Sequence, residues 1–204
     1  LLALLVGGLY CNTLDNLPTN WDDPALFARE ALKSFSPEHL RTIFTMDRGA
    51  TYQPVRDLSY MLDFAIWGER EVFGMHVHSL VLYILMLLCG WVFLDQLFRA
   101  FAVEDKRRFI WASLTTLIYA VHPVHVESVA WLYARKETLL GIFTFLCLAA
   151  FLRARAGLWR YALLSLVFLV LAIMSKPTAL AIPGVMVVLD VCLQLQRREV
   201  QPNP

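Results

Sequence analysis

Apolar residues in this chain are gathered into runs long enough to cross a lipid bilayer, and short charged clusters separate the runs. Hydrophobic residues make up 58% and charged residues 17% of the sequence, whereas soluble domains average about 45–50% and about 25%. Crossing about 30 Å of hydrocarbon takes roughly 20 residues of helix, because lipid cannot satisfy free backbone groups. The runs are apolar on every face, without the alternation of a β-barrel. The sequence therefore predicts an all-α, polytopic membrane protein and excludes a soluble globular domain.

The apolar runs predict one truncated span followed by five further spans. In order along the chain they are Leu1–Leu14 (truncated), Met75–Phe98, Arg108–Val121, Val124–Leu152, Tyr161–Met174 and Ala179–Leu195. We expect Pro123 to mark a break near the membrane surface, since proline is tolerated in the first turn of a helix. Because the sequence starts inside an apolar run, we interpret it as a fragment of a longer protein.

Lysine and arginine clusters predict the orientation of the spans. The clusters follow the second, fourth and sixth spans, so they lie on one side, which the positive-inside rule assigns to the cytoplasm. They are Lys106, Arg107 and Arg108, then Arg153, Arg155 and Arg160, and last Arg197 and Arg198. The opposite, extracytoplasmic side then holds residues 15–74 and the turns near residues 122–125 and 175–178.

The segment Asp15–Gly74 is too polar for a membrane span and is expected to form an extracytoplasmic loop with juxtamembrane helices. One predicted helix covers Pro24–Phe35, with Asp22 or Asp23 as its cap. A second covers Val55–Trp67, where apolar residues recur at helical spacing. Amphipathic helices of this kind lie in the interface plane of a membrane.

Charged groups near membrane depth are costly there and mark candidate functional sites. The first candidate is the pair Asp22 and Asp23, which follows the first span. The pair either caps a helix or acts chemically, with one carboxylate taking a proton from an attacking hydroxyl while the other orients it or binds a cation. Both interpretations stay open, and so does the need for a divalent metal. The four cysteines have no spacing typical of a metal site or a disulfide framework.

Two further clusters on the same side contain histidines and cations. They are His122, His125, Glu127, Arg135 and Lys136 in the second cluster, and Lys176 in the third. If the chain from His125 to Lys136 formed a continuous helix, these two side chains would lie on the same face of it. The cations either anchor the surface by snorkelling or bind an anion such as a lipid phosphate, with a two-pronged contact from arginine and a point charge from lysine. We expect the three clusters to converge on one pocket at the membrane surface.

The segment His122–Gly141, HPVHVESVAWLYARKETLLG, resembles the corresponding part of a known group of membrane proteins. These are bacterial membrane proteins with tetratricopeptide repeats, related to the transmembrane and tetratricopeptide repeat-containing O-mannosyltransferases. Three other segments fit the same family in the same order. They are NWDDPALF at Asn20–Phe27, TYQPVRDLSYMLDFAIWG at Thr51–Gly68 and MSKPTALAIPGVMVVLD at Met174–Asp190.

The resemblance implies a glycosyltransferase fold of the GT-C type, which uses a polyprenyl-phosphate-linked sugar as donor. It places the acidic motif of the first extracytoplasmic loop at Asp22 and Asp23, which would act as general base. Inverting transfer, with lipid phosphate as leaving group, is then expected. On electrostatic grounds we assign the lipid phosphate to His122, His125, Arg135, Lys136 and Lys176. Glu127 would orient a histidine or serve as a second acid.

The sequence thus predicts a glycosyltransferase of bacterial inner membranes that glycosylates a hydroxyl of a protein or glycan at the extracytoplasmic face. No cofactor is predicted, and the expected partners are the lipid-linked sugar, the acceptor and the bilayer, not nucleic acid. One alternative is a non-catalytic membrane anchor for downstream tetratricopeptide repeats. Another is a transporter, although transporter sites lie near the bilayer midplane and these charges gather at one surface.

Overall fold

A computed structural model describes residues 2–45, 51–68 and 71–200 of the chain, with side chains described up to residue 196. Within these ranges the secondary structure is helical and contains no strand. Three helical segments are long and apolar enough to cross a membrane: Val72–Ala100, Leu132–Arg155 and Pro177–Gln196. A fourth span arises if Asp105–Val121 and Pro123–Ala130, which meet at 58°, form one bent span. The all-α, polytopic membrane architecture is confirmed.

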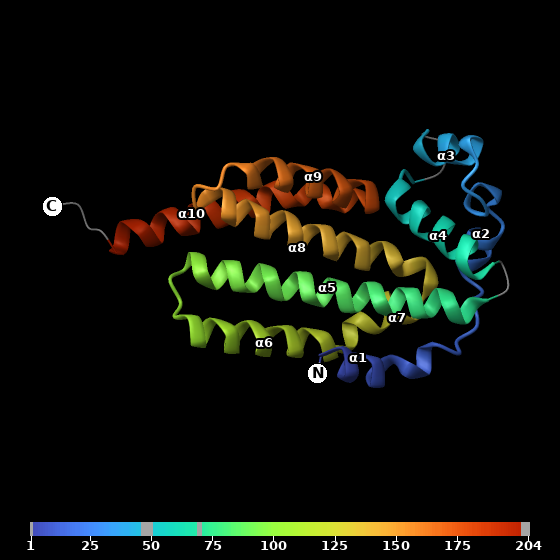
Figure 1. Ribbon diagram of the computed structural model, residues 1–204, viewed down its shortest axis with the longest axis horizontal. Helices are drawn as coiled ribbons and strands as arrows, with labels where there is room; N and C mark the ends of the chain where they lie inside the picture. Colours follow the sequence, from blue (N-terminus) through green and yellow to red (C-terminus); the bar gives the residue numbers. More distant parts are fainter. Residues whose placement is uncertain (1, 46–50, 69–70, 201–204) are drawn as a thin grey trace.

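The long helices form an array with α5 (Val72–Ala100) in its middle (Figure 1). Helix α6 (Asp105–Val121) lies on one side of α5, and α8 (Arg135–Arg155) lies on the other. Helices α9 (Arg160–Ser175) and α10 (Ile182–Val200) pack beyond α8. At 16 residues, α9 is shorter than a typical span, although it is one of those predicted.

The shorter N-terminal helix α1 (Leu2–Tyr10) packs against α5 and continues into the turn η1 (Cys11–Thr13). The Tyr10 ring meets the Tyr83 ring edge-on, with centroids 5.5 Å apart. Leu1, the first residue of the predicted truncated span, lies outside the described residues.

A glycine allows α5 and α8 to approach closely. A Cβ atom added at Gly141 on α8 would overlap the side chain of Met86 on α5. Small residues at such crossings permit close backbone packing, which is the main source of helix association in lipid. Met86, Leu87 and Ile142 fill the core on either side of this contact.

The described part of the loop before α5, residues 15–45 and 51–68, folds against one end of the array (Figure 1). It contains α2 (Asp23–Phe27), η2 (Glu30–Leu32), α3 (Pro37–Phe44) and α4 (Pro54–Trp67). Their apolar faces form a separate core with Met75 and Leu132. Helix α4 covers the predicted segment 55–67.

The predicted helix Pro24–Phe35 is wrong, because α2 ends at Phe27. Arg29 then takes an extended conformation, with φ −85° and ψ 97°. Its guanidinium donates to the Asp57 carboxylate over 2.7 Å. A tertiary ion pair with α4 therefore accompanies the interruption of the local helix.

The expected continuous helix Val124–Leu152 is also interrupted. The chain forms η3 (Pro123–His125), α7 (Val126–Ala130) and η4 (Leu132–Ala134) before α8 begins. Trp131 is extended, with ψ 119°, and the Tyr133 N–H donates to Asp23 Oδ1 over 3.1 Å rather than continuing the helix. The break at Pro123 occurs where it was predicted, but the shared helix face of His125 and Lys136 is not formed.

The α5–α6 and α8–α9 connections lie at the same end of the array, opposite the loop helices (Figure 1). The helix ends that flank these connections carry the basic clusters that predict the cytoplasmic side. The side chains of Arg197 and Arg198 lie outside the described residues.

Helix α5 is followed by Ala102, whose backbone conformation is strained, and we expect Ala102→Gly to stabilise the protein by about 1 kcal/mol. The φ of Ala102 is +57°. Its N–H donates to Arg99 O over 3.0 Å and the Val103 N–H to Phe98 O over 3.0 Å, which is the Schellman arrangement that favours glycine. The measurement is the thermal unfolding midpoint in detergent. Ala156→Gly, at a φ of −80°, is the control and should not raise the midpoint; equal shifts in both variants would contradict the interpretation.

Candidate functional site

Asp23 is a buried carboxylate whose acceptor positions are occupied. Its side chain is 1% exposed. Oδ2 accepts from the Thr19 N–H over 2.7 Å and from the Thr19 hydroxyl over 3.0 Å. Oδ1 accepts from the Tyr133 N–H over 3.1 Å. Asp23 therefore ties the loop to the turn that precedes α8.

Asp22 stands in contrast to its neighbour. It occupies the N-cap position of α2, but its side chain makes no capping hydrogen bond. The residue is half-buried, and its carboxylate has no hydrogen bond or ion pair to any residue that the structure describes. Asp22 thus occupies the cap position without capping the helix through its side chain. Its carboxylate oxygens are available for proton transfer.

Two cations share the ring of Tyr133. Lys136 Nζ lies 4.4 Å from the ring centroid and Arg56 Cζ lies 5.2 Å from it. Lys136 is also within electrostatic range of Asp22 and Lys176, without a hydrogen bond or ion pair to either. We call Asp22, Arg56, Tyr133 and Lys136 the Tyr133 cluster. It combines a free carboxylate with positive charge, which is an arrangement suited to an anionic leaving group.

Asp57 on α4 fixes Arg56 in this cluster. Asp57 Oδ1 accepts from Arg56 Nε over 3.0 Å and from Nη2 over 2.7 Å. Burial alone would lower the pKa of Arg56, but Asp57 raises it above its ordinary value. A cavity of about 230 Å³ opens beside the pair, between Arg29, Thr51, Arg56 and Tyr133. The cluster thus borders a space that a polar group can enter.

Arg135, predicted as a phosphate ligand, is 1% exposed. Its guanidinium forms an ion pair with the buried Asp63 of α4, which also pairs with His78 of α5. It donates to Met75 O over 2.9 Å and to Ser79 Oγ over 3.1 and 3.2 Å. We call Asp63, His78, Ser79 and Arg135 the buried network. Arg135 in this structure joins α4, α5 and α8.

Tyr60 strengthens the same junction. Its hydroxyl donates to Leu132 O over 2.6 Å, and its ring lies 4.7 Å below the Arg135 guanidinium. Burial raises the pKa of the Tyr60 hydroxyl far above its ordinary value, so it remains a donor. The bond holds the turn before α8 against α4.

His125 and Glu127 line a second hollow, a groove of about 480 Å³ between the α6–α7 bend and α8. Glu127 is exposed, and the His125 ring centroid lies 4.1 Å from that of Tyr119. Glu137 lines the same groove and accepts from Lys176 Nζ over 2.6 and 2.7 Å. We call this hollow the Glu127 groove.

The predicted residues thus fall into separate environments. Asp22 and Lys136 belong to the Tyr133 cluster by electrostatic range, and Asp23 accepts a hydrogen bond from the Tyr133 N–H. His125 and Glu127 line the Glu127 groove, and Lys176 reaches the groove through Glu137. The remaining two are His122, which is exposed, and Arg135, which is buried. Instead of the single pocket expected, the two hollows have no lining residue in common.

Sequence reasoning missed Arg56, Asp57 and Asp63. All three lie within the segment Thr51–Gly68, whose resemblance to the family was noted without assigning a role to any of its charges. The signal available in the sequence was that these three charged residues lie on a predicted helix that also has an apolar face. Among the described residues, no three His, Cys, Asp or Glu side chains gather as metal ligands.

Comparisons with known proteins yield several distant relatives. The chain is 26% identical over 150 residues to Protein O-mannosyl-transferase F38B6.6 of Caenorhabditis elegans, covering 74% of this chain and 20% of that protein. It is 24% identical over 195 residues to human Protein O-mannosyl-transferase TMTC3, covering 90% and 20%. It is 28% identical over 158 residues to mouse Protein O-mannosyl-transferase TMTC1, covering 69% and 15%.

The chain spans about a fifth or less of the length of these curated relatives. No family model matches it, and no solved structure matches it significantly. With identities of 23–28% across the matches, the chain is a distant relative of the protein O-mannosyl-transferases.

Proposed function

We propose that the protein of which this chain is a part transfers a sugar from a polyprenyl-phosphate-linked donor to a hydroxyl group of a protein or glycan. In this proposal the reaction takes place at the extracytoplasmic face of the membrane, at the end of the array that carries the loop helices. A bacterial inner membrane is the proposed location. The distant relationship to protein O-mannosyl-transferases supports the reaction class.

One observation carries the proposal: two cations lie on one aromatic ring, and one of them, Lys136, is within electrostatic range of the Asp22 carboxylate, which makes no hydrogen bond to a described residue. Asp22 has no partner among the described residues, whereas Asp23 accepts three hydrogen bonds. Arg56 and Lys136 flank Tyr133. A base and an anion-stabilising group are the two elements that glycosyl transfer from a lipid phosphate requires.

In the proposed step, Asp22 accepts the proton of the acceptor hydroxyl as its oxygen attacks the anomeric carbon of the donor. A new carbon–oxygen bond forms there, and the bond between the anomeric carbon and the phosphate oxygen breaks. The electron pair leaves with the lipid phosphate, whose charge Lys136 and Arg56 stabilise. Attack opposite the leaving group inverts the anomeric centre. Asp23 and Tyr133 position these groups.

The Glu127 groove supplies a second candidate for the base. Glu127 is exposed within it and near His125, and the groove opens beside apolar helix surfaces where a lipid chain can lie. In this version Lys176, paired with Glu137, supplies positive charge at the groove, while His122, whose Nδ1 accepts from the Val124 N–H, offers its other ring nitrogen as a donor. Arg135, whose guanidinium is bound on several sides, is assigned a structural role in either version.

The test is release of polyprenyl phosphate by the full-length protein in detergent, from a panel of radiolabelled polyprenyl-phosphate sugars with and without peptide acceptors. We expect release from at least one donor, and faster release when an acceptor is present. A folded protein that releases nothing from any donor would contradict the transferase and favour the non-catalytic anchor. A transporter would instead move the labelled donor or a solute across sealed vesicles without cleaving it.

A further inference from the structure

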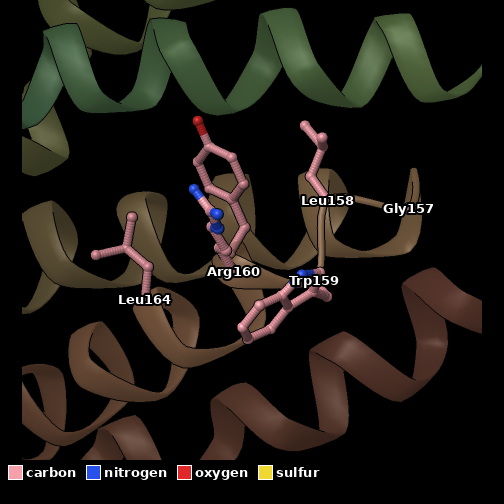
Figure 2. Close-up of a pocket in the computed structure, with 6 residues that line it drawn as sticks. Gly157, Leu158, Trp159, Arg160 and Leu164 are labelled. Atoms are coloured by element: carbon pink, nitrogen blue, oxygen red, sulfur yellow. The ribbon is translucent and has the colours of Figure 1, made fainter.

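A large hollow lies at the end of the array opposite the candidate site, at the turn between α8 and α9. It has a volume of about 720 Å³ and is lined by Gly157, Leu158, Trp159, Arg160, Tyr161 and Leu164 (Figure 2). Gly157 has a φ of +99°, which favours glycine. The Leu158 N–H donates to Arg153 O over 3.2 Å, which closes the turn tightly. The hollow is thus formed by a well-defined turn.

Arg160 is an unpaired cation at this hollow. Arg155 forms an ion pair with Asp190 over 2.6 Å. Arg153 donates to the Tyr161 hydroxyl over 3.0 Å. Arg160 has no carboxylate partner among the residues that the structure describes, and its side chain is exposed. Its guanidinium can therefore bind an external anion by two parallel hydrogen bonds.

An apolar groove begins next to the hollow. Its volume is about 410 Å³, and it lies between α8, α9 and α10, with Phe151, Leu169 and Met186 in its lining. Trp159 lines both the groove and the hollow. In Figure 2 the Trp159 ring points away from Leu158, toward the neighbouring helix on the groove side. The hollow that contains Arg160 and the apolar groove therefore meet at Trp159.

The surrounding side chains have the character of the membrane–water interface. Trp159 is 74% exposed and Leu164 is 39% exposed, and tryptophan is enriched at the headgroup level. Helix α9 has 16 residues, which is about 24 Å of helix against about 30 Å of hydrocarbon. Its first residue, Arg160, is thereby placed within reach of lipid phosphates.

We propose that the α8–α9 turn is a binding site for an anionic phospholipid. The phosphate accepts hydrogen bonds from Arg160, the Trp159 ring lies beside the glycerol backbone, and one acyl chain occupies the groove along α9 and α10. Charge complementarity selects an anionic over a zwitterionic lipid, because the neighbouring Arg153 adds positive charge. The site is separate from the proposed transferase site and does not depend on its activity.

The test is native mass spectrometry of the full-length protein in neutral detergent, titrated with dioleoyl phosphatidylglycerol or dioleoyl phosphatidylcholine. We expect tighter binding of phosphatidylglycerol and roughly fivefold weaker binding in Arg160→Gln, the loss of one cation near the headgroup. Leu166→Trp, which fills the groove, should weaken binding as well while Arg160 remains.

The matched control is Lys106→Gln, which removes an exposed cation near the start of α6, at the same end of the array, where it has no carboxylate partner among the described residues. Its binding of phosphatidylglycerol should equal that of the wild type. Equal losses in Lys106→Gln and Arg160→Gln would overturn the site, because they indicate general electrostatic attraction. Equal binding of the two lipids, or displacement of phosphatidylglycerol by millimolar glycerol phosphate, would overturn it too.

Discussion

Arg135→Met is expected to lower the stability of the protein by about 3–5 kcal/mol, the cost of removing one partner of a buried ion pair. Asp63 is fully buried and forms ion pairs with Arg135 and with His78. Removing the guanidinium leaves the buried Asp63 carboxylate with His78 as its remaining ion-pair partner. It also leaves Met75 O and Ser79 without their donor. Helices α4, α5 and α8 meet at this point, so the loss affects all three.

The measurement is the unfolding midpoint of purified protein in detergent, followed by heating or by denaturant. Arg135→Met/Asp63→Leu should recover much of the loss, because replacing both partners of a buried pair by apolar residues is often nearly neutral. Lys136→Met is the adjacent control and should change the midpoint little, since Lys136 is half-exposed. A double variant no more stable than Arg135→Met would contradict the assignment of the loss to the broken Arg135–Asp63 pair.

Asp22→Asn is expected to reduce release of polyprenyl phosphate by about 10²–10⁴-fold, the usual contribution of a positioned general base. Asparagine keeps the size of aspartate but cannot accept the proton. The unfolding midpoint should stay unchanged, because the Asp22 side chain makes no hydrogen bond to a described residue.

Asp23→Asn provides the comparison for this prediction. It places an amide where Oδ1 and Oδ2 accept three hydrogen bonds, so both the midpoint and the activity should fall. Loss of activity without loss of stability thus distinguishes a base from a positioning residue. If Asp22→Asn retains full turnover while Glu127→Gln does not, the base lies in the Glu127 groove instead.

The membrane-spanning helices could be predicted from sequence because their cause is local. The apolar runs of α5 and α10 are long enough to span without reference to the rest of the chain. The same holds for the break at Pro123, where proline itself limits the helix. The amphipathic period of Val55–Trp67 located α4 in the same way.

The candidate site could be predicted only in part, because its geometry depends on contacts between distant segments. Neither the sequence near Trp131 nor that near Arg135 indicates that a helix stops there. The interruption accompanies the bond from the Tyr133 N–H to Asp23, 110 residues away. Likewise, the motif could not distinguish Asp22 from Asp23. The two residues differ because the folded chain buries the carboxylate of Asp23 and leaves that of Asp22 half-buried.

The bond between Asp23 and residue 133 has a consequence for how the protein tolerates substitution. The donor is a backbone N–H, so every residue except proline can supply it at position 133. The Tyr133 ring, in contrast, contacts Lys136 and Arg56, and Arg56 is also fixed by Asp57. Docking of the loop and placement of the cations thus depend on different atoms of a single residue. The charge distribution of the cluster is therefore adjustable by changing one side chain, without loosening the attachment of the loop.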